Sequence, residues 1–268
     1  MINDNLNIID IYDAYLDIKQ EEHKLKYSEH KGWFSASTAG SCFKKQWYKL
    51  NEEHEEPLDK RVKRLLRLGT IVHKDVQEAI DWYNDIFKTS SKNDSKEYRT
   101  EYAITLDEFK VIGHLDAMYI DYNNKTIDLI DLKTIGDYPW KMRFGIKKNR
   151  DKNPSNHYYY QVATYMLGIG VELDEDCGIK KEEREFFEYD MGIVWYNKND
   201  SRLKSISIDP VWTTLAKEYW TELNEFIDSG DDIQSIQPGT AINVPAEHWE
   251  CGYCPFETKC KGGQNEYF

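Results

Sequence analysis

Two acidic residues, Asp116 and Asp131, lie at equal distances along the chain from a candidate hairpin turn, Asn123-Asn124. Asparagine tolerates the left-handed backbone conformations of a two-residue turn, so this dipeptide is a credible loop between two strands. The register of such a hairpin places the two acids opposite each other, on the same face of the sheet. Lys133 follows Asp131 by two residues and therefore projects from that face as well.

Two carboxylates in this arrangement need a positive charge between them. At a separation of roughly 5 Å and an effective dielectric of about 20, their repulsion is roughly 3 kcal/mol. A divalent metal beside a lysine would neutralise it, and Mg²⁺ and Mn²⁺ are hard cations that prefer oxygen ligands. Such a metal polarises a phosphoryl oxygen and lowers the pKa of bound water, while Lys133 would orient the water or neutralise developing charge. Asp131-Leu-Lys133 and Gly113-x-x-Asp116 are each uninformative alone, so the prediction of hydrolytic chemistry rests on their joint register.

Other side chains are candidates for the same site. His73 lies on a predicted helix, four residues after Gly69, but a lone histidine is more often structural, and the residues alone favour that interpretation. Glu101, on the preceding strand, is a weaker candidate. Gln161 and Tyr165 share one face of a predicted helix, although Gln-x-x-x-Tyr in isolation carries little weight.

The pattern of apolar residues predicts the elements that position these side chains. Helices are expected over residues 6–26, 43–50, 58–87, 158–169 and 211–227. Strands are expected near residues 98–106, 110–121 and 126–133, with a second hairpin over 191–196 and 203–208. The stretch 136–156 is long, basic and contains proline, which is typical of a functional or mobile loop.

Length and composition indicate a soluble globular protein. The 268 residues would form one large domain or two small ones, and 40% of them are hydrophobic and 31% charged. No apolar run approaches a membrane span, and the N-terminus lacks the pattern of a signal peptide. We therefore expect no membrane association and a location in the reducing cytoplasm of a bacterium, an archaeon or a phage-infected cell. The five cysteines would not form disulfides there.

The net charge of −13 argues against indiscriminate nucleic-acid binding through a uniformly basic surface, but not against a local basic track. Residues 60–67 and 141–150 are the two candidate tracks, and a solvated helix or loop face is the more common use of either segment alone. The three adjacent tyrosines at residues 158–160 would stack nucleobases or, more commonly, pack in the core.

Three cysteines within ten residues, Cys251, Cys254 and Cys260, indicate metal ligation in a cytoplasmic protein. A tetrahedral centre needs a fourth thiolate, which Cys42 or Cys177 would supply. Cys177 follows an acidic stretch and is interpreted as a free thiol, whereas Cys42 lies where a loop meets a helix. A centre that includes Cys42 would close a long loop, worth up to about 5 kcal/mol in the chain-entropy model. Such sites hold Zn²⁺ or an iron–sulfur cluster, and one distant cysteine with a group of three favours the cluster.

Together, these motifs resemble the RecB/AddB-type branch of the PD-(D/E)XK nuclease superfamily. The family order is kept by Gly69-x-x-x-His73, Gly113-x-x-Asp116, Asp131-x-Lys133 and Gln161-x-x-x-Tyr165. The split cysteine set is similar to that of the AddB subunit and of the CRISPR-associated iron–sulfur exonucleases. The resemblance covers about residues 35–260, and five motifs in family order are very specific although each is weak alone.

The resemblance implies a role for each residue of the acidic hairpin. His73, Asp116, Asp131 and the backbone carbonyl of Leu132 would hold the catalytic Mg²⁺ or Mn²⁺. Lys133 would be the catalytic lysine. Asp131 departs from many relatives, which carry Glu at that position, but Asp is allowed within the superfamily.

The resemblance also implies the DNA contacts and the second cofactor. Gln161 and Tyr165 would contact DNA near the scissile phosphate. A structural 4Fe–4S cluster, with Zn²⁺ as the alternative, would have four ligands: Cys42, Cys251, Cys254 and Cys260.

The fold class that the resemblance implies is α/β, a nuclease core with a mixed central sheet flanked by helices. An N-terminal helical segment (residues 1–57) would carry the first cluster cysteine, followed by the nuclease core (58–230) and a C-terminal cysteine segment (231–268). The four-cysteine centre would join the two end segments into one compact unit.

The favoured function is a metal-dependent exonuclease that acts on single-stranded DNA or duplex ends in recombination, repair, phage or CRISPR DNA processing. Recombination or CRISPR-adaptation proteins are the expected protein partners. AddB carries a large helicase-like region for which this chain has no room, so size favours a stand-alone nuclease. The alternatives are a non-catalytic DNA-binding or assembly subunit that retains the fold and the cluster, and a zinc-stabilised interaction protein.

Overall fold

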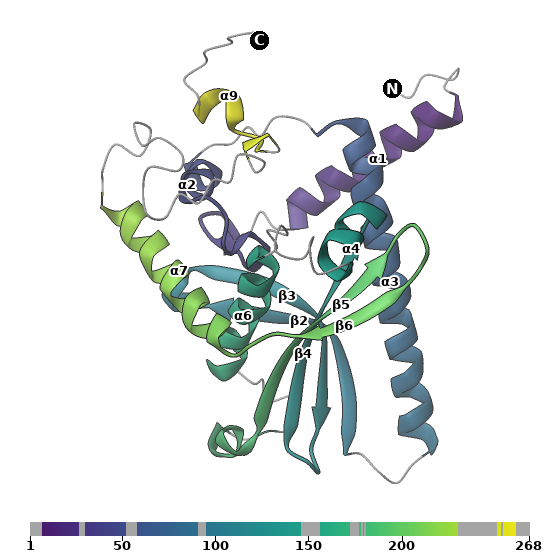
Figure 1. Ribbon diagram of the computed structural model, residues 1–268, viewed down its shortest axis with the longest axis vertical. Helices are drawn as coiled ribbons and strands as arrows, with labels where there is room; N and C mark the ends of the chain where they lie inside the picture. Colours follow the sequence, from purple (N-terminus) through teal and green to yellow (C-terminus); the bar gives the residue numbers. More distant parts are fainter. Residues whose placement is uncertain are drawn as a thin grey trace.

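A computed structural model describes residues 7–26, 30–51, 58–90, 95–145, 156–171, 177, 179, 181–229, 251–252 and 254–260 (Figure 1). In this part of the chain the fold is α/β, with one mixed sheet flanked by helices. The α-helices are α1 (Ile8–Lys26), α2 (Phe43–Asn51), α3 (Lys60–Ser90), α4 (Asp137–Phe144), α6 (Asn156–Val171), α7 (Val211–Asp228) and α9 (Glu257–Cys260). The strands are β1 (Phe34–Ser35), β2 (Lys96–Leu106), β3 (Val111–Asp121), β4 (Thr126–Ile135), β5 (Glu188–Asn197) and β6 (Leu203–Ser207). Short 3₁₀ helices are η2 (Ala36–Thr38), η3 (Asp107–Phe109) and η5 (Lys181–Phe186).

The central strand of the site is β3, whose two edges are paired differently. Along one edge it pairs antiparallel with β2 at every residue except Asp116. The opposite edge is shared, because β1 pairs in parallel with residues 111–112 and β4 pairs antiparallel with residues 117–121. Residues 113–116 therefore have no strand partner on that edge. Beyond the hairpin, β4 continues in parallel beside β5, which turns back into β6.

The register of the β3–β4 hairpin is the one that the sequence predicts. Ala117 pairs with Ile130, so the next position along each strand sets Asp116 opposite Asp131. The predicted strands and helices are all present, with bounds that differ by a few residues.

The turn of this hairpin differs from the two-residue loop that the sequence predicts. The strands end at Asp121 and Thr126, so four residues connect them. The left-handed conformation falls on Lys125, with φ of 54°, and not on the asparagines. The Asp121 carboxylate explains this, because it accepts hydrogen bonds from the backbone N–H groups of Asn123 (3.1 Å) and Asn124 (3.0 Å) and so holds an Asx-type turn. Two added residues, one on each side, keep the parity of the pairing unchanged.

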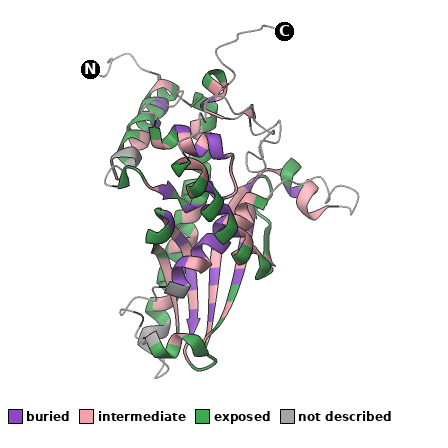
Figure 2. Cartoon of the chain, turned by 90° about the vertical axis from the view of Figure 1, so that its left-hand side faces the viewer, coloured by how far each residue is buried: buried purple, intermediate pink, exposed green. Residues whose placement is uncertain are grey.

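Buried apolar side chains form two clusters, and α6 contributes to both. Tyr165 and Ile169 belong to the cluster under β2, β3 and β4, while Val162 and Ala163 belong to the cluster beside β5. The helix packs closely on β2 at Gly168, where an added Cβ would lie 2.0 Å from the Ile104 side chain. Figure 2 shows the buried positions running along the strands, whereas the N-terminal helix is mostly exposed.

One predicted loop contains a helix. Residues 137–144 form α4, although the sequence predicts an irregular stretch over 136–156. Trp140 supplies the reason, since its ring is 6% exposed and packs edge-on against Phe144 with 4.7 Å between ring centroids. The segment 146–155 of the predicted loop lies outside the described residues.

The long helix α3 and the N-terminal helix α1 expose much of their apolar surface. Leu65 and Leu68 of the predicted α3 stripe are 50% and 51% exposed, and Ile8 of α1 is 81% exposed. The sheet therefore covers only part of the α3 stripe. No helix among the described residues is long and apolar enough to span a membrane.

Replacing Asp121 by Ala tests the turn. The backbone N–H of Asn124 and the ammonium of Lys96 hold the pKa of Asp121 below its ordinary value of 3.8. Its stabilising effect is then complete above that value and is lost as the pH falls through the lower folded pKa. We expect Asp121→Ala to lower the free energy of unfolding by about 1–2 kcal/mol at pH 7, and by progressively less below pH 3.8. Urea unfolding of both proteins across this range measures the difference, and a difference independent of pH would contradict the assignment.

Candidate active site

Three acids occupy one row across three neighbouring strands. The pairing registers set Asp116 on β3 opposite Asp131 on β4 and opposite Glu101 on β2. The backbone ladder is interrupted at this row, because Glu101 is unpaired although both its neighbours pair with β3, and its φ is 50°. The β3 and β4 strands separate at the same row, because their last backbone pair is Ala117 with Ile130, directly before the two acids. The acids therefore lie at an opening in the sheet.

Asp116 is held by groups from a helix and from the neighbouring strand. Its Oδ1 lies 3.0 Å from Nδ1 of His73 on α3, and its Oδ2 accepts a hydrogen bond of 2.7 Å from the backbone N–H of Leu132. Burial by itself would raise the pKa of Asp116. The hydrogen bond and charge of His73, with the charge of Lys133, outweigh burial and keep that pKa below its ordinary value. Asp116 is thus ionised at neutral pH.

Asp131 is almost fully buried, with 1% of its surface exposed. The ammonium of Lys133 lies 2.8 Å from its Oδ2, and the side-chain amide of Gln161 donates a long hydrogen bond of 3.3 Å to its Oδ1. Oδ2 receives no hydrogen bond of good geometry, so its contact with Lys133 is an ion pair alone. Burial raises the pKa of Asp131 from 3.8 to about 6, although Lys133 opposes the rise.

The Lys133 ammonium lies between the acids and an aromatic ring. It is 5.5 Å from the centre of the Tyr158 ring and in contact with Asp131. Burial by itself would lower the pKa of Lys133, but the negative charges of Asp131 and Asp116 outweigh burial and raise it. The lysine is therefore protonated at neutral pH, so it acts as a cation and hydrogen-bond donor and not as a general base.

Gln161 and Tyr165 are positioned by α6 behind the acids. The Gln161 amide donates hydrogen bonds to Asp131 and to the Tyr165 hydroxyl, the latter at 2.7 Å. Both side chains are buried, at 6% and 2% exposed. In this arrangement they orient a carboxylate, and the contact with DNA implied by the resemblance stays a prediction.

The two motif glycines mark close approaches between elements. A Cβ at Gly113 would lie 2.8 Å from both the Ala36 methyl and the Tyr165 ring, so η2 and α6 meet over β3 only because this position lacks a side chain. A Cβ at Gly69 would lie 3.1 Å from the Thr134 hydroxyl, which shows that α3 crosses β4 one turn before His73. Both glycines bring a helix to the row of acids.

Two positions near the row received little weight from the sequence. Glu101, the weaker candidate, completes the row of acids, and its carboxylate accepts a hydrogen bond from Gln77. Gln77 itself was missed, although it follows His73 by four residues on α3 and therefore shares its face. The signal that could have found it is this spacing from a candidate ligand.

The donor types at the row suit a hard divalent cation, since they comprise two carboxylates, an imidazole and a neighbouring main-chain carbonyl. Asp131 Oδ2 is buried and its one contact is the ion pair with Lys133, so it keeps an acceptor position for a metal cation. Among the described residues, however, no group of three or more His, Cys, Asp or Glu side chains is arranged to hold a metal ion. In this arrangement the Lys133 ammonium neutralises Asp131, and the His73 ring lies 3.0 Å from Asp116.

Four of the five cysteines lie in two segments that contact each other: Cys42 directly precedes α2, and Cys251, Cys254 and Cys260 lie in the C-terminal segment. The Tyr48 ring of α2 stacks on Phe256 with 5.4 Å between centroids, which brings α9 to α2 (Figure 1). Burial raises the pKa of the Cys42 thiol to about 11, and the nearby thiols of Cys260 and Cys254 add to the rise. Burial raises the pKa of Cys254 too, with Cys260 and Cys251 contributing.

Cys177 lies apart from this group. Its side chain is 3% exposed in the main core, and its backbone carbonyl accepts a hydrogen bond from the Tyr122 hydroxyl at 2.9 Å. None of the five cysteines takes part in a disulfide.

The basic segment 60–67 faces α1. Arg64 makes a two-pronged contact with Asp13, with Nε–Oδ1 of 2.8 Å and Nη2–Oδ2 of 2.7 Å, and the Lys63 ammonium lies 2.7 Å from Asp17. These cations are therefore paired within the protein and do not form the simple solvated face that the sequence favours.

The second basic segment is described only over residues 141–145. Lys141 pairs with Asp137, and the Arg143 guanidinium lies 4.1 Å from the centre of the Trp195 ring. The tyrosines at 158–160 pack against Trp195 and Trp212, with 5.1 to 5.2 Å between ring centroids, and are partly buried at the margin of the core. Residues 146–150 lie outside the described part of the chain.

The family profile of the PD-(D/E)XK nuclease superfamily matches residues 36–261. The crystal structure of SSO0001 is similar at 17% identity over 92% of this chain and 95% of that chain, with a TM-score of 0.49. A putative exonuclease from Eubacterium rectale has 14% identity, coverages of 78% and 86%, and a TM-score of 0.44. An alkaline exonuclease from Laribacter hongkongensis has 14% identity, coverages of 76% and 91%, and a TM-score of 0.39.

No curated protein matches the chain. Structural similarity at these TM-scores is weak, so the family assignment rests on the profile match.

Replacing Asp131 by Asn tests the electrostatics of the row in protein kept free of metal with EDTA. Because its folded pKa is raised from 3.8 to about 6, the folded state holds a proton that the unfolded state loses first. Wild-type stability therefore falls as the pH rises through this window. The free energy of unfolding of Asp131→Asn, taken relative to that of the wild type, should rise by about 2–3 kcal/mol as the pH increases from 3.8 to above 6. Asp81→Asn, which removes an exposed acid on α3, is the control, and an equal gain there would contradict the prediction.

Proposed function

The chain belongs to the PD-(D/E)XK nuclease superfamily, and on that premise we propose that it is a metal-dependent DNA exonuclease of the RecB/AddB-type branch. It would act on single-stranded DNA or on duplex ends. The observation that carries the proposal is the row of acids with Lys133 in contact with Asp131, placed at an opening of the sheet. A catalytic lysine beside paired acids is the arrangement that phosphodiester hydrolysis needs.

His73, Asp116, Asp131 and the carbonyl of Leu132 would hold Mg²⁺ or Mn²⁺. Such a cation, when bound, polarises a phosphoryl oxygen and lowers the pKa of a water molecule. The protein's own contribution is to fix the acids: His73 and the Leu132 N–H orient Asp116, and Gln161 on α6 orients Asp131. Lys133, protonated at neutral pH, would orient the attacking water or neutralise charge that develops on the phosphate.

The basic segments 60–67 and 141–150 would hold the DNA backbone. Phosphates would compete with Asp13 and Asp17 for Arg64 and Lys63, since both acids already occupy these cations. Binding through several phosphate contacts weakens steeply with salt.

A 4Fe–4S cluster would be held by Cys42, Cys251, Cys254 and Cys260 and would fix the C-terminal segment to α2, with Zn²⁺ as the alternative. The mutual influence of these thiols on their pKa values and the packing of Phe256 on Tyr48 support the proposal. The cluster would be structural, because no redox step is needed for hydrolysis.

The biological setting that fits this activity is cytoplasmic DNA processing in recombination, repair, phage replication or CRISPR adaptation. Proteins of those pathways would be its partners.

Replacing Lys133 by Ala tests the proposed chemistry. We expect cleavage to fall by at least about 100-fold, because the cation facing the reacting phosphate is removed. Folding and DNA binding should be largely retained, and Asp131→Ala should behave in the same way. Lys217→Ala on α7 and Asp128→Ala on β4 are matched controls outside the row. Wild-type cleavage by Asp131→Ala would contradict the assignment.

The assay uses end-labelled single-stranded DNA and closed circular DNA with anaerobically purified protein in Mn²⁺, Mg²⁺ or EDTA. Metal-dependent loss of linear DNA that spares circles is the expected result. Cleaved circles would make the protein an endonuclease. Absence of cleavage by folded wild-type protein would favour the non-catalytic DNA-binding subunit.

Replacing single cysteines tests the cluster. Anaerobically purified wild-type protein should absorb near 400 nm, as iron–sulfur proteins do, and should contain iron. Cys42→Ala and Cys254→Ala should lose both the absorbance and part of their thermal stability. Cys177→Ala is the matched control, because it removes a buried cysteine outside the group and should keep the absorbance. A colourless wild-type protein that contains zinc would replace the cluster by Zn²⁺.

A further inference from the structure

A second cation, Arg143 of α4, lies close to the row of acids. The pairing of β4 with β5 sets Lys133 beside Trp195, on the same face of the sheet and about 4.8 Å away between the two strands. The Arg143 guanidinium lies over the Trp195 ring, with 4.1 Å between its Cζ and the ring centre. Arg143 therefore covers the strand that adjoins Lys133.

The Tyr158 ring of α6 connects these two cations. Its centre is 5.5 Å from the Lys133 ammonium, and it packs edge-on against Trp195 with 5.2 Å between ring centroids. An unbroken series of contacts thus runs from Lys133 through two aromatic rings to Arg143. A strand of DNA whose scissile phosphate faces Lys133 would pass near Arg143 if it continued in this direction.

The printed contacts of the Arg143 guanidinium are with neutral groups. Its Nη1 donates a hydrogen bond of 2.9 Å to the Tyr159 hydroxyl, and its charge lies over the Trp195 and Tyr159 rings. Its Nη2 is buried and has no hydrogen-bond acceptor among the residues that the structure describes. A buried donor without an acceptor is costly, and arginine keeps its charge in proteins. A phosphate oxygen would supply both the acceptor and the counter-charge.

Several cations act on the first turn of α6, beside Arg143. Burial lowers the pKa of His157 to about 4, and the charges of Lys133, Arg143 and Lys45 contribute to the lowering. The imidazole is therefore neutral at pH 7. Cations from three elements (β4, α4 and α2) converge on this turn, and their summed field attracts an anion.

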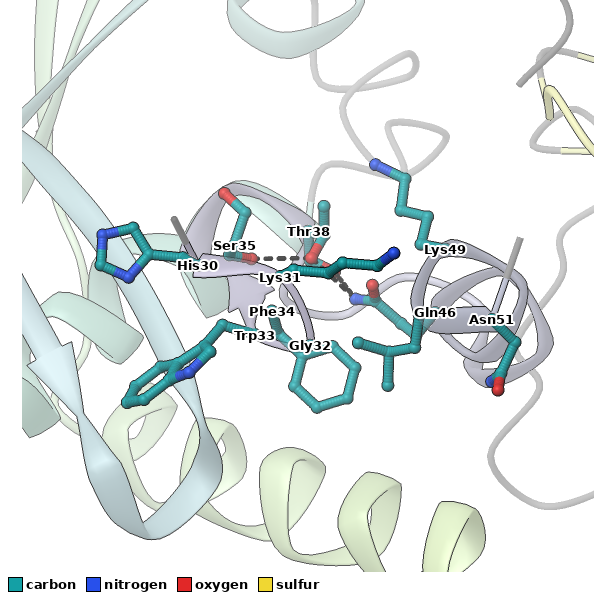
Figure 3. A pocket seen from close by; sticks show the side chains of 11 residues that line it. His30, Lys31, Gly32, Trp33, Phe34, Ser35, Thr38, Gln46, Lys49 and Asn51 are labelled. Carbon is teal, nitrogen blue, oxygen red and sulfur yellow. Dashed lines mark hydrogen bonds between the residues drawn. The ribbon is translucent and has the colours of Figure 1, made fainter. Parts of the chain in front are cut away.

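The first turn of α6 is held by the segment that precedes α2. An added Cβ at Gly40 would lie 3.3 Å from the His157 Cα, so the two backbones are in close contact. The segment is in turn tied to α2, because the Gln46 amide donates to the backbone carbonyl and to the hydroxyl of Thr38, both at 2.8 Å (Figure 3). The hydroxyl of Tyr159 is thus presented by a supported helix, which preorganises the guanidinium that it contacts.

We propose that Arg143 binds a backbone phosphate near the scissile one, so that the DNA strand leaves the row of acids toward β5 and α4. Lys133 then faces the reacting phosphate, and Arg143 fixes the direction of the strand. The inference rests on the proposed nuclease function for the identity of the anion, and on the contacts of Arg143 for its recognition. An arginine suits this role because its planar fork matches the geometry of phosphate oxygens.

Binding of DNA to the metal-free protein tests the phosphate contact. Fluorescence anisotropy of a labelled single-stranded oligonucleotide is measured in EDTA at several salt concentrations, with the full chain. Arg143→Gln should weaken binding by about tenfold and reduce the log–log salt slope by about 0.7, because one phosphate contact is lost. Arg143→Lys keeps the charge but loses the planar contact with the ring, so it should keep the wild-type slope.

Arg202→Gln is the matched control. The Arg202 guanidinium also lies over a tryptophan, 5.2 Å from the centre of the Trp140 ring, but it forms an ion pair of 2.6 Å with Asp200. We expect its replacement to leave the salt slope unchanged. A wild-type slope in Arg143→Gln would overturn the proposal. An equal loss of slope in Arg143→Gln and Arg143→Lys would also overturn it, because lost packing and not lost charge would then be the cause.

Cleavage kinetics test which phosphate Arg143 contacts. In Mg²⁺, Arg143→Gln should raise KM by about tenfold and change kcat by less than about twofold, because a contact made equally before and in the transition state affects binding alone. A fall in kcat of about 100-fold, as expected of Lys133→Ala, would place Arg143 at the reacting phosphate and overturn the proposal.

Failure of this proposal is distinguishable from failure of the proposed function. A wild type that binds single strands with a salt slope that depends on Arg143, but that cuts no DNA, would contradict the nuclease function and leave the phosphate contact standing. A wild type that cuts DNA, with an Arg143→Gln variant that binds with the wild-type slope, would contradict the phosphate contact alone.

Discussion

The site depends on one electrostatic constraint, which is that a buried carboxylate, Asp131, and a partly buried one, Asp116, face each other where β3 and β4 separate. Like charges this close are tolerated in a protein interior only when neighbouring groups compensate them. Lys133 provides a counter-charge from the same strand as Asp131, and the His73 ring of α3 lies 3.0 Å from Asp116. Because the strands separate there, the Leu132 N–H reaches the Asp116 carboxylate in place of a backbone carbonyl of β3. The opening of the sheet, the lysine and the position of α3 are therefore parts of one arrangement.

Three helical elements reach this row because two side chains are absent. Gly69 lets α3 cross β4 at a point where an added Cβ would lie 3.1 Å from the Thr134 hydroxyl, and Gly113 lets η2 and α6 meet over β3. Gly69 lies four residues before His73 on α3, and Gly113 lies three residues before Asp116 on β3. Each spacing is the distance along the helix or strand from the close contact at the glycine to the functional side chain. The motif spacings are thus packing requirements as well as chemical ones. The same α6 enters both core clusters, so the support behind Asp131 is a helix anchored in the core on both sides.

The sequence could predict the hairpin register because parity depends only on where the chain reverses. A four-residue turn and a two-residue turn that are centred on the same peptide bond give the same cross-strand pairs. The predicted pairing of Asp116 with Asp131 was therefore confirmed although the predicted turn length was wrong. The periodicity of apolar residues predicted the other long helices and the strands of both hairpins. It did not predict α4, because the burial of one residue, Trp140, stabilises that helix. The partners of Arg64 and Lys63 were also beyond prediction, since they come from α1, some fifty residues away in the chain. Long-range charge pairing leaves no periodic signal in a sequence.

The way α1 is attached has a consequence for how the protein responds to salt. Of the α1 side chains that the structure describes, only Asp13 and Leu16 are buried, and its acids contact the cations of α3. The acids of α1 act as counterions to α3 that belong to the same chain. Their local concentration at α3 therefore does not change with the concentration of protein. Salt screens this internal contact and any contact with an external polyanion alike. A polyanion that binds α3 must displace the acids of α1, and salt weakens the contacts of those acids as well. The affinity of the polyanion for α3 therefore falls less with rising salt than the number of its contacts with α3 implies.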